Sequence, residues 1–478
     1  MYNIRMLKLT KIIATIGPVS DSPETIRKLI ESGVNVFRFN FKHNSIDWHS
    51  DRIKRVNKIA LEMGVPIGTL IDLQGPELRI NMPKDQIKVE EGEILYFGEN
   101  VFENNKKGFS ITHPDIIPHL KDGQPVLADD GSFSFRVVKK GKSTFLASQT
   151  TGVLKNRKTL NIPGADFPFP VLIDRDFRGL ELAARHDVDF IALSFVRTQS
   201  DLRTVRKEAK KYKVNAKLIA KIETEKALGN LDKIIESADG VMVARGDLGV
   251  EIPIEQVPFY QKMIIKKCII KGKFVITATQ MLQTMIEHPY PTRAEISDIA
   301  NAVYDSTDCI MLSGETASGA HPLKTVEVMN KTAIFYEAKV DTDIRKYIQF
   351  SPNDSTAMIC DTAYGLYREY VKTHQRIEGF VVFSQTGTTA KGISRYRPKV
   401  PIFAFVPTNE ICESLTVEFG VFPFTFAFSE ANEVSIADIK RATKILKDNR
   451  ILKQLGTVIV IHGDQWGQGS GATTVRIV

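Results

Sequence analysis

Alternating strand-like and helical segments predict an α/β protein built on a closed (β/α)₈ barrel, with an all-β insertion and a second α/β domain behind it. Three observations indicate this fold class. Runs rich in β-branched residues alternate with amphipathic helical patterns through most of the first 343 residues. The alternation stops between about residues 80 and 166, and a shorter α/β series starts near residue 345.

The barrel is predicted from eight β-branched runs, each followed by a helical pattern. Three precede the interruption, at 11–17, 35–41 and 69–74, and five follow Pro168, at 190–196, 217–223, 240–249, 274–280 and 309–316. Eight parallel strands with intervening helices close into a barrel whose chemistry lies at the carboxyl ends of the strands. We expect this domain to comprise residues 1–78 and 167–343.

The two other domains follow from the change of pattern. Residues 79–166 contain short strands with Gly and Asp turns, and we expect them to form a small β-barrel lid over the mouth of the main barrel. Residues 344–478 are expected to form an open-sheet α/β domain. Its predicted elements are a helix near 355–374 and strands at 380–385, 401–407, 421–426 and 456–463.

Composition excludes several classes of protein. The 478 residues are 43% hydrophobic and 25% charged, which is typical of folded globular proteins. No apolar stretch is long enough to span a bilayer and no signal pattern opens the chain, so we expect a cytoplasmic protein that contacts no membrane. The net charge is +8, but the basic runs carry no interleaved aromatic residues, which argues against nucleic-acid binding. The four widely spaced cysteines are expected to be buried thiols.

Polar residues gather where the predicted strands end, and polar side chains elsewhere in such strands would be buried at a cost. They include Arg38, Asn40, Lys42, His43, Asp72, Glu77, Arg79, Ser194, Arg197, Lys221, Glu223, Arg245, Asp247, Thr277, Thr279, Gln280, Ser313 and Glu315. Lys221 and Glu223 lie two apart on one strand and therefore face the same side. Asp247 ends the next strand and supplies a second carboxylate for a Mg²⁺ site, with Mn²⁺ as a possible substitute. A buried Lys221–Glu223 ion pair without a metal is the alternative.

The segment ARGDLG places Gly246 and Gly249 around Asp247, so a ligand can approach the backbone closely and meet its N–H groups. Together with KIIATIGP, RFNFKH, DLQGPELR, KIE, ATQML, SRYRPKVPI and the long block PTRAEISDIANAVYDSTDCIMLSGETASG, it resembles the pyruvate kinase family in order, spacing and wording. The resemblance covers nearly the whole chain. It implies Mg²⁺-dependent transfer of the phosphoryl group of phosphoenolpyruvate to ADP, giving pyruvate and ATP, by a homotetramer.

The resemblance also implies roles for individual residues. Lys221 would be the catalytic lysine at the transferred phosphate, and Glu223 and Asp247 would bind Mg²⁺. Thr279 would lie near the methylene carbon that is protonated through water, and the backbone N–H groups of Gly246 and Asp247 would hold the substrate carboxylate. The remaining implied contacts are Arg38, Arg79 and Ser194 to substrate, and Asn40, His43, Arg79, Asp130, Lys158 and Ser313 to the nucleotide.

The chain departs from the family at the potassium site. Family members usually have Ser and Thr where this sequence has Lys42 and Leu73, while Asn40 and Asp72 are kept. An ammonium has the charge of K⁺, and the stem of Lys42 is long enough to place it near Asp72, so we hypothesise that K⁺ is not required. Relatives described as potassium-independent carry Lys at the position of Glu77, which this chain keeps. In the alternative, Lys42 extends into solvent and the cation site is damaged.

The C-terminal domain contains a hydroxyl-rich loop that opens a helix: Ser384, Thr386, Gly387, Thr388 and Thr389. Helix amino ends with such loops bind phosphate, and in the family this loop binds phosphorylated effectors together with a late loop that matches 463–471. A plain N-cap is the alternative for one or two of these residues. Two other functions also stay open: a magnesium-dependent lyase acting on a pyruvate enolate, and a catalytically silent paralogue that binds metabolites.

Overall fold

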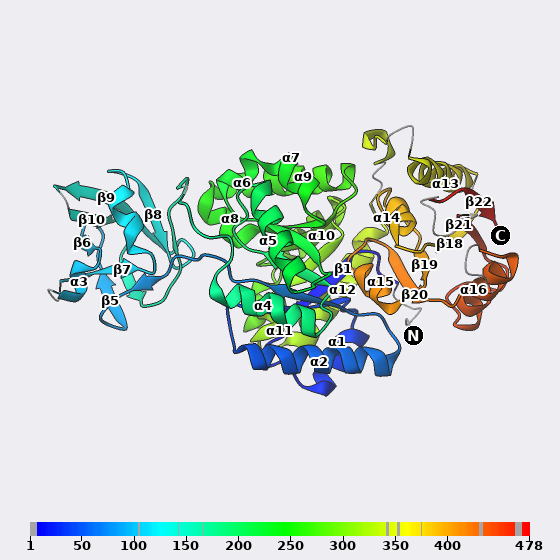
Figure 1. Cartoon of the computed structure of the whole chain (residues 1–478), viewed down its shortest axis with the longest axis horizontal. Coiled ribbons are helices and arrows are strands. Elements are labelled where there is room, and N and C mark those ends of the chain that lie inside the picture. The colour runs from blue at the N-terminus through cyan, green and yellow to red at the C-terminus, as the bar shows by residue number, and fades with distance from the viewer. Residues whose placement is uncertain are drawn as a thin grey trace.

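The computed structural model describes residues 7–103, 106–141, 143–165, 167–340, 344–350, 354–373, 375–429, 434–463 and 471–478. Figure 1 shows three parts in a row. A β-rich part lies at the left, the barrel lies in the centre, and an α/β part lies at the right. No helix among the described residues is both long and apolar enough to cross a membrane.

The central part is a closed barrel of eight parallel strands in the order β1-β17-β16-β15-β14-β13-β3-β2. The strands are β1 Lys11–Thr15, β2 Val36–Asn40, β3 Gly68–Asp72, β13 Phe190–Leu193, β14 Lys217–Ile222, β15 Gly240–Ala244, β16 Phe274–Ala278 and β17 Cys309–Leu312. All eight predicted strands are therefore confirmed. The predicted sixth strand is wrong beyond Ala244, because the chain turns there into helix α8 (Arg245–Glu251).

Helices surround the barrel: α1 Pro23–Glu31, α2 Ile46–Met63, α4 Asp174–Arg185, α5 Gln199–Lys211, α6 Glu225–Gly229, α7 Leu231–Ser237, α9 Val257–Ile270, α10 Arg293–Tyr304, α11 Gly314–Ala317 and α12 Pro322–Glu337, with short 3₁₀ turns η3 Ile254–Gln256 and η4 Gln283–Ile286. Their starts follow from local sequence. Ser22 caps α1 with Pro23 in its first turn, and Thr292 and Glu295 form a capping box at α10.

The inside of the barrel is apolar at one end and polar at the other. Side chains near the strand starts, such as Val36, Phe190 and Phe274, form a buried apolar cluster, and the rings of Phe190 and Phe274 meet edge to face at 5.9 Å. This packed layer closes the amino end of the barrel. The carboxyl ends of the strands are consequently the place where inward-facing polar groups can meet a ligand.

The part between β3 and β13 is mostly β. Its elements are β4 Ile80–Asn81, β5 Gln86–Val89, β6 Ile94–Phe97, α3 Asn100–Glu103, β7 Gly108–Ile111, η2 Pro114–His119, β8 Pro125–Ala128, β9 Phe133–Lys140, β10 Ser143–Ser148, β11 Gly152–Lys155 and β12 Leu160–Asn161. They form a seven-stranded sheet in the order β12-β8-β9-β10-β6-β7-β4 and a β11–β5 pair. Phe97, Phe109 and Phe135 belong to its own core. We call this part the lid.

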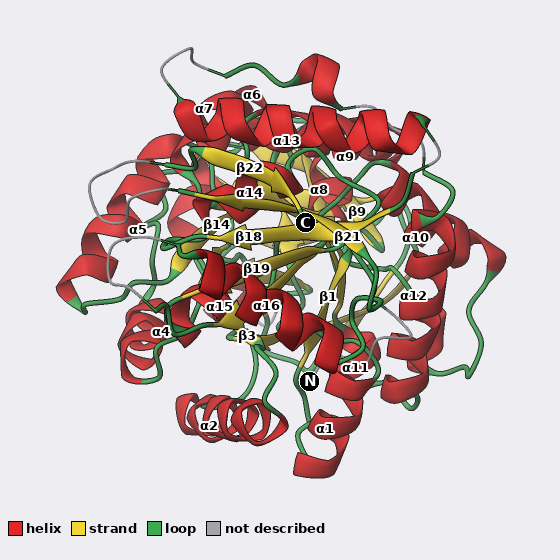
Figure 2. Cartoon of the chain, turned by 90° about the vertical axis from the view of Figure 1, so that its right-hand side faces the viewer, coloured by secondary structure: helices red, strands yellow, loops and turns green. Residues whose placement is uncertain are grey.

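The C-terminal part is an open sheet in the order β20-β19-β18-β21-β22. Its elements are η5 Arg345–Tyr347, α13 Ser355–Lys372, β18 Ile377–Phe383, α14 Thr388–Ser394, β19 Ile402–Val406, α15 Asn409–Ser414, β20 Val421–Thr425, α16 Ile436–Asp448, β21 Thr457–His462 and β22 Thr474–Ile477. Side chains alternate along β18, so Phe380 packs on the side of α13 and Val381 on the side of α16. Figure 2 shows these two helices on opposite sides of the sheet.

The lid and the C-terminal domain contact opposite ends of the barrel. Lys11 starts β1 and donates a hydrogen bond from Nζ to the carbonyl of Val421 at 2.6 Å. Arg397 of the C-terminal domain pairs with Asp308, just before β17, at 2.7 Å. The C-terminal domain therefore covers the amino ends of the strands and leaves the carboxyl ends to the lid.

Candidate active site

Lys221 is the centre of a buried charged cluster at the carboxyl ends of the strands. Its ammonium lies 2.8 Å from Glu223, 3.3 Å from Asp72 and 2.7 Å from the hydroxyl of Ser194. Arg38 completes the cluster through Nη2, which lies 2.7 Å from Asp72. Strands β2, β3 and β14 and the loops after β13 and β14 thus bring five of the predicted site residues into one connected group.

The charges of this cluster are strongly coupled. Burial acts to lower the pKa of Lys221, but the carboxylates of Asp72, Glu223 and Asp247 outweigh it, so that pKa lies above its ordinary value. Burial acts to raise the pKa of Asp72, but Lys221 and Arg38 bring it below its usual range. Lys221 is therefore held charged in a site only 4% exposed to solvent.

Glu223 and Asp247 are the predicted magnesium ligands. Glu223 is fully buried; one carboxylate oxygen accepts the Phe195 N–H at 2.6 Å and the other faces Lys221. Burial raises the pKa of Glu223, Lys221 opposes the rise, and Asp247 adds to it. Two carboxylates that supply hard oxygen donors fit a divalent cation such as Mg²⁺. Within the described ranges no group of three or more His, Cys, Asp and Glu could hold a metal ion, so substrate oxygens would have to complete the shell.

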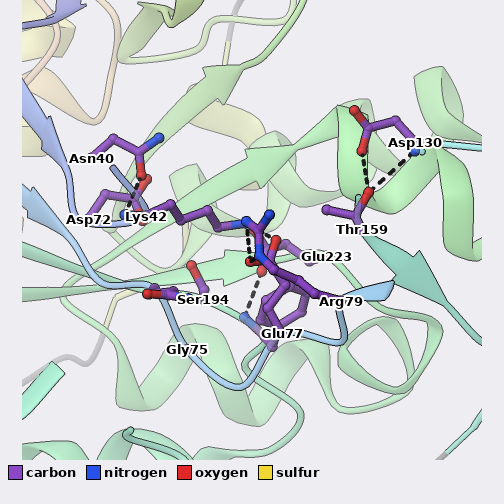
Figure 3. A network of polar contacts seen from close by, with 12 residues as sticks. Asn40, Lys42, Asp72, Gly75, Glu77, Arg79, Asp130, Thr159, Ser194 and Glu223 are labelled. Carbon is purple, nitrogen blue, oxygen red and sulfur yellow. Dashed lines mark hydrogen bonds and ion pairs between the residues drawn. The ribbon is translucent and has the colours of Figure 1, made fainter. Parts of the chain in front are cut away.

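Lys42 is not a solvent-facing lysine. Figure 3 shows its side chain running toward Glu77, and the ion pair measures 3.1 Å with the Lys42 side chain 17% exposed. The same carboxylate pairs with Arg79 at 2.7 Å through its other oxygen. We expected the ammonium of Lys42 beside Asp72, but its direct partner is Glu77, because Arg38 and Lys221 already take both oxygens of Asp72. Lys42 acts on Asp72 only at longer range, where it helps to lower the pKa of that carboxyl.

The other residues of the predicted monovalent-cation site make separate contacts. The Asn40 side chain accepts the backbone N–H of Lys42 at 3.2 Å, so it shapes the turn after β2. Leu73 is fully buried and contributes only its carbonyl, which accepts the Ser194 hydroxyl at 2.8 Å. In this arrangement the ammonium of Lys42 faces one oxygen of the Glu77 carboxylate, and the guanidinium of Arg79 faces the other.

Thr279 follows β16 in an unusual backbone conformation. Its φ is 65°, and that of Gln280 is 53°, which places two successive non-glycine residues in the left-handed region. The Thr279 hydroxyl accepts the Gly246 N–H at 2.8 Å and donates to the Ala278 carbonyl at 2.7 Å. The Gly246 N–H, which we expected to face the substrate carboxylate, is thus directed at Thr279 in this structure.

A glycine is not required at 246 by the fold itself. Gly246 lies in helix α8, and a Cβ there would approach nothing closer than Thr279 Oγ1 at 3.6 Å, which is an ordinary contact. A Cβ at this position would rest against the Thr279 side chain without a clash. Close approach of a ligand explains the glycine better than packing does.

The predicted nucleotide residues are more dispersed. Asp130 accepts a hydrogen bond from the hydroxyl of Thr159 at 2.9 Å (Figure 3), and Lys158 pairs with Asp129 at 2.7 Å, so both contacts stay within the lid. The Ser313 N–H donates to Glu315 at 2.7 Å after β17. These residues are not in direct contact with the Lys221 cluster.

A cavity of about 330 Å³ connects the lid to the barrel. It is lined on one side by residues 159–162, Gly164, Ala165, Phe167 and Phe169, and on the other by residues that include Glu77, Phe195 and Asp247. Near its polar side, burial and then the charges of Arg79, Lys42 and Arg38 lower the pKa of His43. The positive charges of Arg79, Lys42 and Arg38 around His43 form a cationic region suited to phosphate.

The hydroxyl-rich loop lies in the C-terminal domain, away from the lid. Gly387 is the N-cap of α14 with φ 80°, and no side chain caps this helix. The hydroxyls of Thr386 and Thr388 are exposed and bond to each other at 2.8 Å, while Ser384 and Thr389 are buried. The plain N-cap alternative therefore applies to Gly387 alone, and neither threonine hydroxyl caps the helix. Most of the second predicted effector segment, 464–470, lies outside the described residues.

Two site features were not anticipated from the sequence. Glu77 bridges Lys42 and Arg79, and the sequence signals only the second pair, since Arg79 follows two residues later whereas Lys42 lies on another strand end. Arg245 binds the backbone carbonyls of Ala278 and Thr279, and nothing in the sequence indicates carbonyl partners on the following strand.

Comparison with known proteins bears on this geometry. The family model described as "Pyruvate kinase, barrel domain" matches residues 7–326, and "Pyruvate kinase, alpha/beta domain" matches residues 368–478. A pyruvate kinase of Bacillus licheniformis is 38% identical over 463 residues, covering 96% of this chain and 77% of the relative. The pyruvate kinase of Staphylococcus aureus MRSA252 is 37% identical over 468 residues, covering 96% of this chain and 77% of the relative. That of Sporosarcina psychrophila is 39% identical over 423 residues, covering 87% of this chain and 72% of the relative. On this similarity and the barrel that carries it, the chain belongs to the pyruvate kinase family.

Proposed function

We propose that the chain transfers the phosphoryl group of phosphoenolpyruvate to ADP with Mg²⁺ held by Glu223 and Asp247. The observation that carries this proposal is Lys221, an ammonium kept charged among Asp72, Glu223 and Asp247 in a buried site. Phosphoryl transfer needs positioned positive charge more than covalent chemistry from the protein. A bound Mg²⁺ would neutralise charge on the phosphoryl and enolate oxygens.

The residues of the chain have distinct proposed tasks. Arg38, Arg79 and Lys221 hold the phosphoryl oxygens, with Ser194 orienting Lys221 through their 2.7 Å hydrogen bond. The amide of Asp247, with that of Gly246 once it is released from Thr279, binds the substrate carboxylate. Asn40, His43, Asp130, Lys158 and Ser313 line the nucleotide side. Thr279 lies where the enolate left after transfer takes up a proton.

We also propose that K⁺ is not required, because the ammonium of Lys42 serves as a tethered cation. Its ion pair with Glu77 and its low exposure support this role over a lysine extended into solvent. Replacing Lys42 by Ser removes the charge and should leave a vacancy that K⁺ can fill. Lys88, which forms an exposed pair with Glu90 on the lid, offers a matched control.

The test is pyruvate formation from phosphoenolpyruvate and ADP, with Mg²⁺ and with Mg²⁺ chelated, each in Na⁺- and K⁺-free buffer and with K⁺ added. We expect Mg²⁺-dependent activity that does not respond to K⁺ in the wild type and in K88S. In K42S we expect a lower rate that K⁺ raises several-fold. Activity in the wild type only with K⁺ would refute the tethered cation, and binding of phosphoenolpyruvate without turnover in any buffer would favour the silent paralogue.

Two further proposals concern assembly and regulation. Ile254 and Phe259 are 75% and 64% exposed on neighbouring segments η3 and α9, which supports a covered interface in a homotetramer. The exposed hydroxyls of Thr386 and Thr388 support a phosphorylated effector at the loop that opens α14. Molecular mass in solution by light scattering and a screen of sugar phosphates for activation test these proposals separately.

A further inference from the structure

The turn after β16 stores backbone strain beside the proposed reaction centre. Thr279 and Gln280 have φ of 65° and 53°, and a β-branched residue is a rare occupant of that region. Such conformations are strained and persist only where the surrounding structure enforces them. Something in this site must therefore hold Thr279 in place.

Arg245 binds two successive backbone carbonyls of this turn. Its Nε donates to the Ala278 carbonyl at 3.0 Å, and its Nη2 donates to the Thr279 carbonyl at 2.6 Å. On its other side the guanidinium pairs with Asp298 of helix α10 at 2.6 Å and lies 3.3 Å from Gln261 of α9. The planar guanidinium can satisfy these partners at once, whereas a lysine ammonium cannot reproduce the fork.

The segment that carries Arg245 also positions the Thr279 hydroxyl. The next residue, Gly246, donates its N–H to Thr279 Oγ1 at 2.8 Å, and Asp247 follows with its carboxylate near Glu223 and Lys221. Arg245 thus contacts the Thr279 backbone, Gly246 contacts the Thr279 hydroxyl, and Asp247 supplies a proposed metal ligand. Movement of the turn would change the hydroxyl position relative to that ligand.

We infer that Arg245 is a positioning residue that holds Thr279 in its left-handed conformation, so that the hydroxyl stands where the pyruvate enolate is protonated. This inference rests on the proposed function. In the step concerned, the enolate carbon–carbon double bond supplies the electron pair of a new C–H bond and the oxygen regains its carbonyl bond. The proton comes from a water at the Thr279 hydroxyl, and the resulting hydroxide is reprotonated from solvent. Arg245 acts through Thr279 and not on the substrate, since its hydrogen bonds go to other residues of the protein.

The proton step can be measured apart from net turnover by the exchange of solvent deuterium into the methyl group of pyruvate, with Mg²⁺ and ATP present. In R245K we expect this exchange to slow by about 10- to 100-fold, the loss expected for a reacting group displaced by about an ångström. The solvent deuterium isotope effect on kcat should rise, because protonation becomes slower than the other steps. KM for phosphoenolpyruvate should stay within about threefold, because the substrate contacts remain.

Arg395 supplies the matched control, since its guanidinium also binds two successive backbone carbonyls, those of Ile269 and Ile270, at the opposite end of the barrel. R395K should leave the exchange rate and the isotope effect unchanged. If R245K does not fold, D298N is the second variant, because it weakens the hold on the guanidinium but keeps both carbonyl bonds. In D298N we expect a smaller loss of exchange than in R245K, again with a rise in the solvent isotope effect.

The outcomes separate this inference from the proposed function. Wild-type enzyme with neither turnover nor exchange would overturn both. Exchange that is lost in T279V but normal in R245K, or in D298N should R245K not fold, would leave the kinase assignment intact and overturn the role of Arg245.

Discussion

Both ends of the barrel bury charged residues, but only one end has the properties of an active site. Lys221 at the carboxyl end is 4% exposed and Lys11 at the amino end is 1% exposed. The pKa of Lys221 is raised by three carboxylates against its burial, whereas burial and the nearby charge of Lys8 lower the pKa of Lys11 to about 7. Burial of a charged side chain therefore does not by itself indicate a functional site.

The difference lies in the partners. Lys11 donates to the Val421 carbonyl and lies 4.1 Å from the centre of the Phe422 ring, and both groups belong to the C-terminal domain. Asp308 at the same end accepts the N–H groups of Val275 and Phe419. These charges are satisfied by backbone and by the domain interface. At the carboxyl end the pairs join side chain to side chain, so a substrate or a metal can replace one partner without unfolding a strand.

The largest expected effect comes from removing the lysine at the carboxyl end. In K221M we expect kcat to fall by about 10³-fold or more, because the buried positive charge at the transferred phosphate is lost. Steady-state pyruvate formation with Mg²⁺ measures it. K11M, which removes an equally buried lysine, should keep kcat within about threefold of the wild type, since Lys11 contacts no group of the proposed site. Equal losses in the two variants would contradict the distinction between the ends.

The second effect concerns stability at the amino end. D308N leaves the guanidinium of Arg397, a 2.7 Å partner in a buried pair, without its counter-charge. Breaking a buried pair in this way costs about 3–5 kcal/mol, and we expect a corresponding drop in the denaturant midpoint. D232N, which breaks the exposed pair with Lys267, should cost less than about 1 kcal/mol. Activity per folded molecule should not change in either variant, and loss of activity in folded D308N would assign the amino end a catalytic role.

The same distinction explains what the sequence could and could not predict. The eight barrel strands were predictable because buried parallel strands are continuous apolar runs, and Lys221, Glu223 and Asp72 were predictable because their polarity interrupts those runs near the carboxyl ends. Strand β22 was missed, since its four residues, Thr474–Ile477, form a short, half-exposed edge strand. The helical start at Arg245 was missed because the RGDLG stretch carries no helix start signal.

Which side chains pair across the site was harder to predict than which residues lie in it. Asp72 was a reasonable partner for Lys42 from strand order alone, but its two oxygens are taken by Arg38 and Lys221, and only three-dimensional packing reveals this competition. The left-handed φ of Thr279 also contradicts the local preference of threonine for extended backbone, and it depends on Arg245 at the start of helix α8. Such conflicts between local preference and tertiary contact concentrate at functional sites.

The smallest expected effect is a pH dependence that Lys11 imparts to stability. The pKa of Lys11 is about 7 in the folded chain against an ordinary value of 10.5, so between these values the folded state binds fewer protons than the unfolded state. The contribution of Lys11 to stability therefore rises as the pH increases from about 7 to about 10, and below pH 7 the chain bears the full cost of burying the charge. Relative to the wild type, K11M should raise the apparent Tm most at pH 6 and least near pH 9. Asp189 and Glu413 at this end, with pKa values raised by burial to about 8 and about 7, give the opposite slope, but both are present in both proteins and cancel in the difference. Thermal melts of the two proteins at matched pH values measure that difference, and a Tm difference that stays constant from pH 6 to pH 9 would show that the buried amine does not titrate with folding.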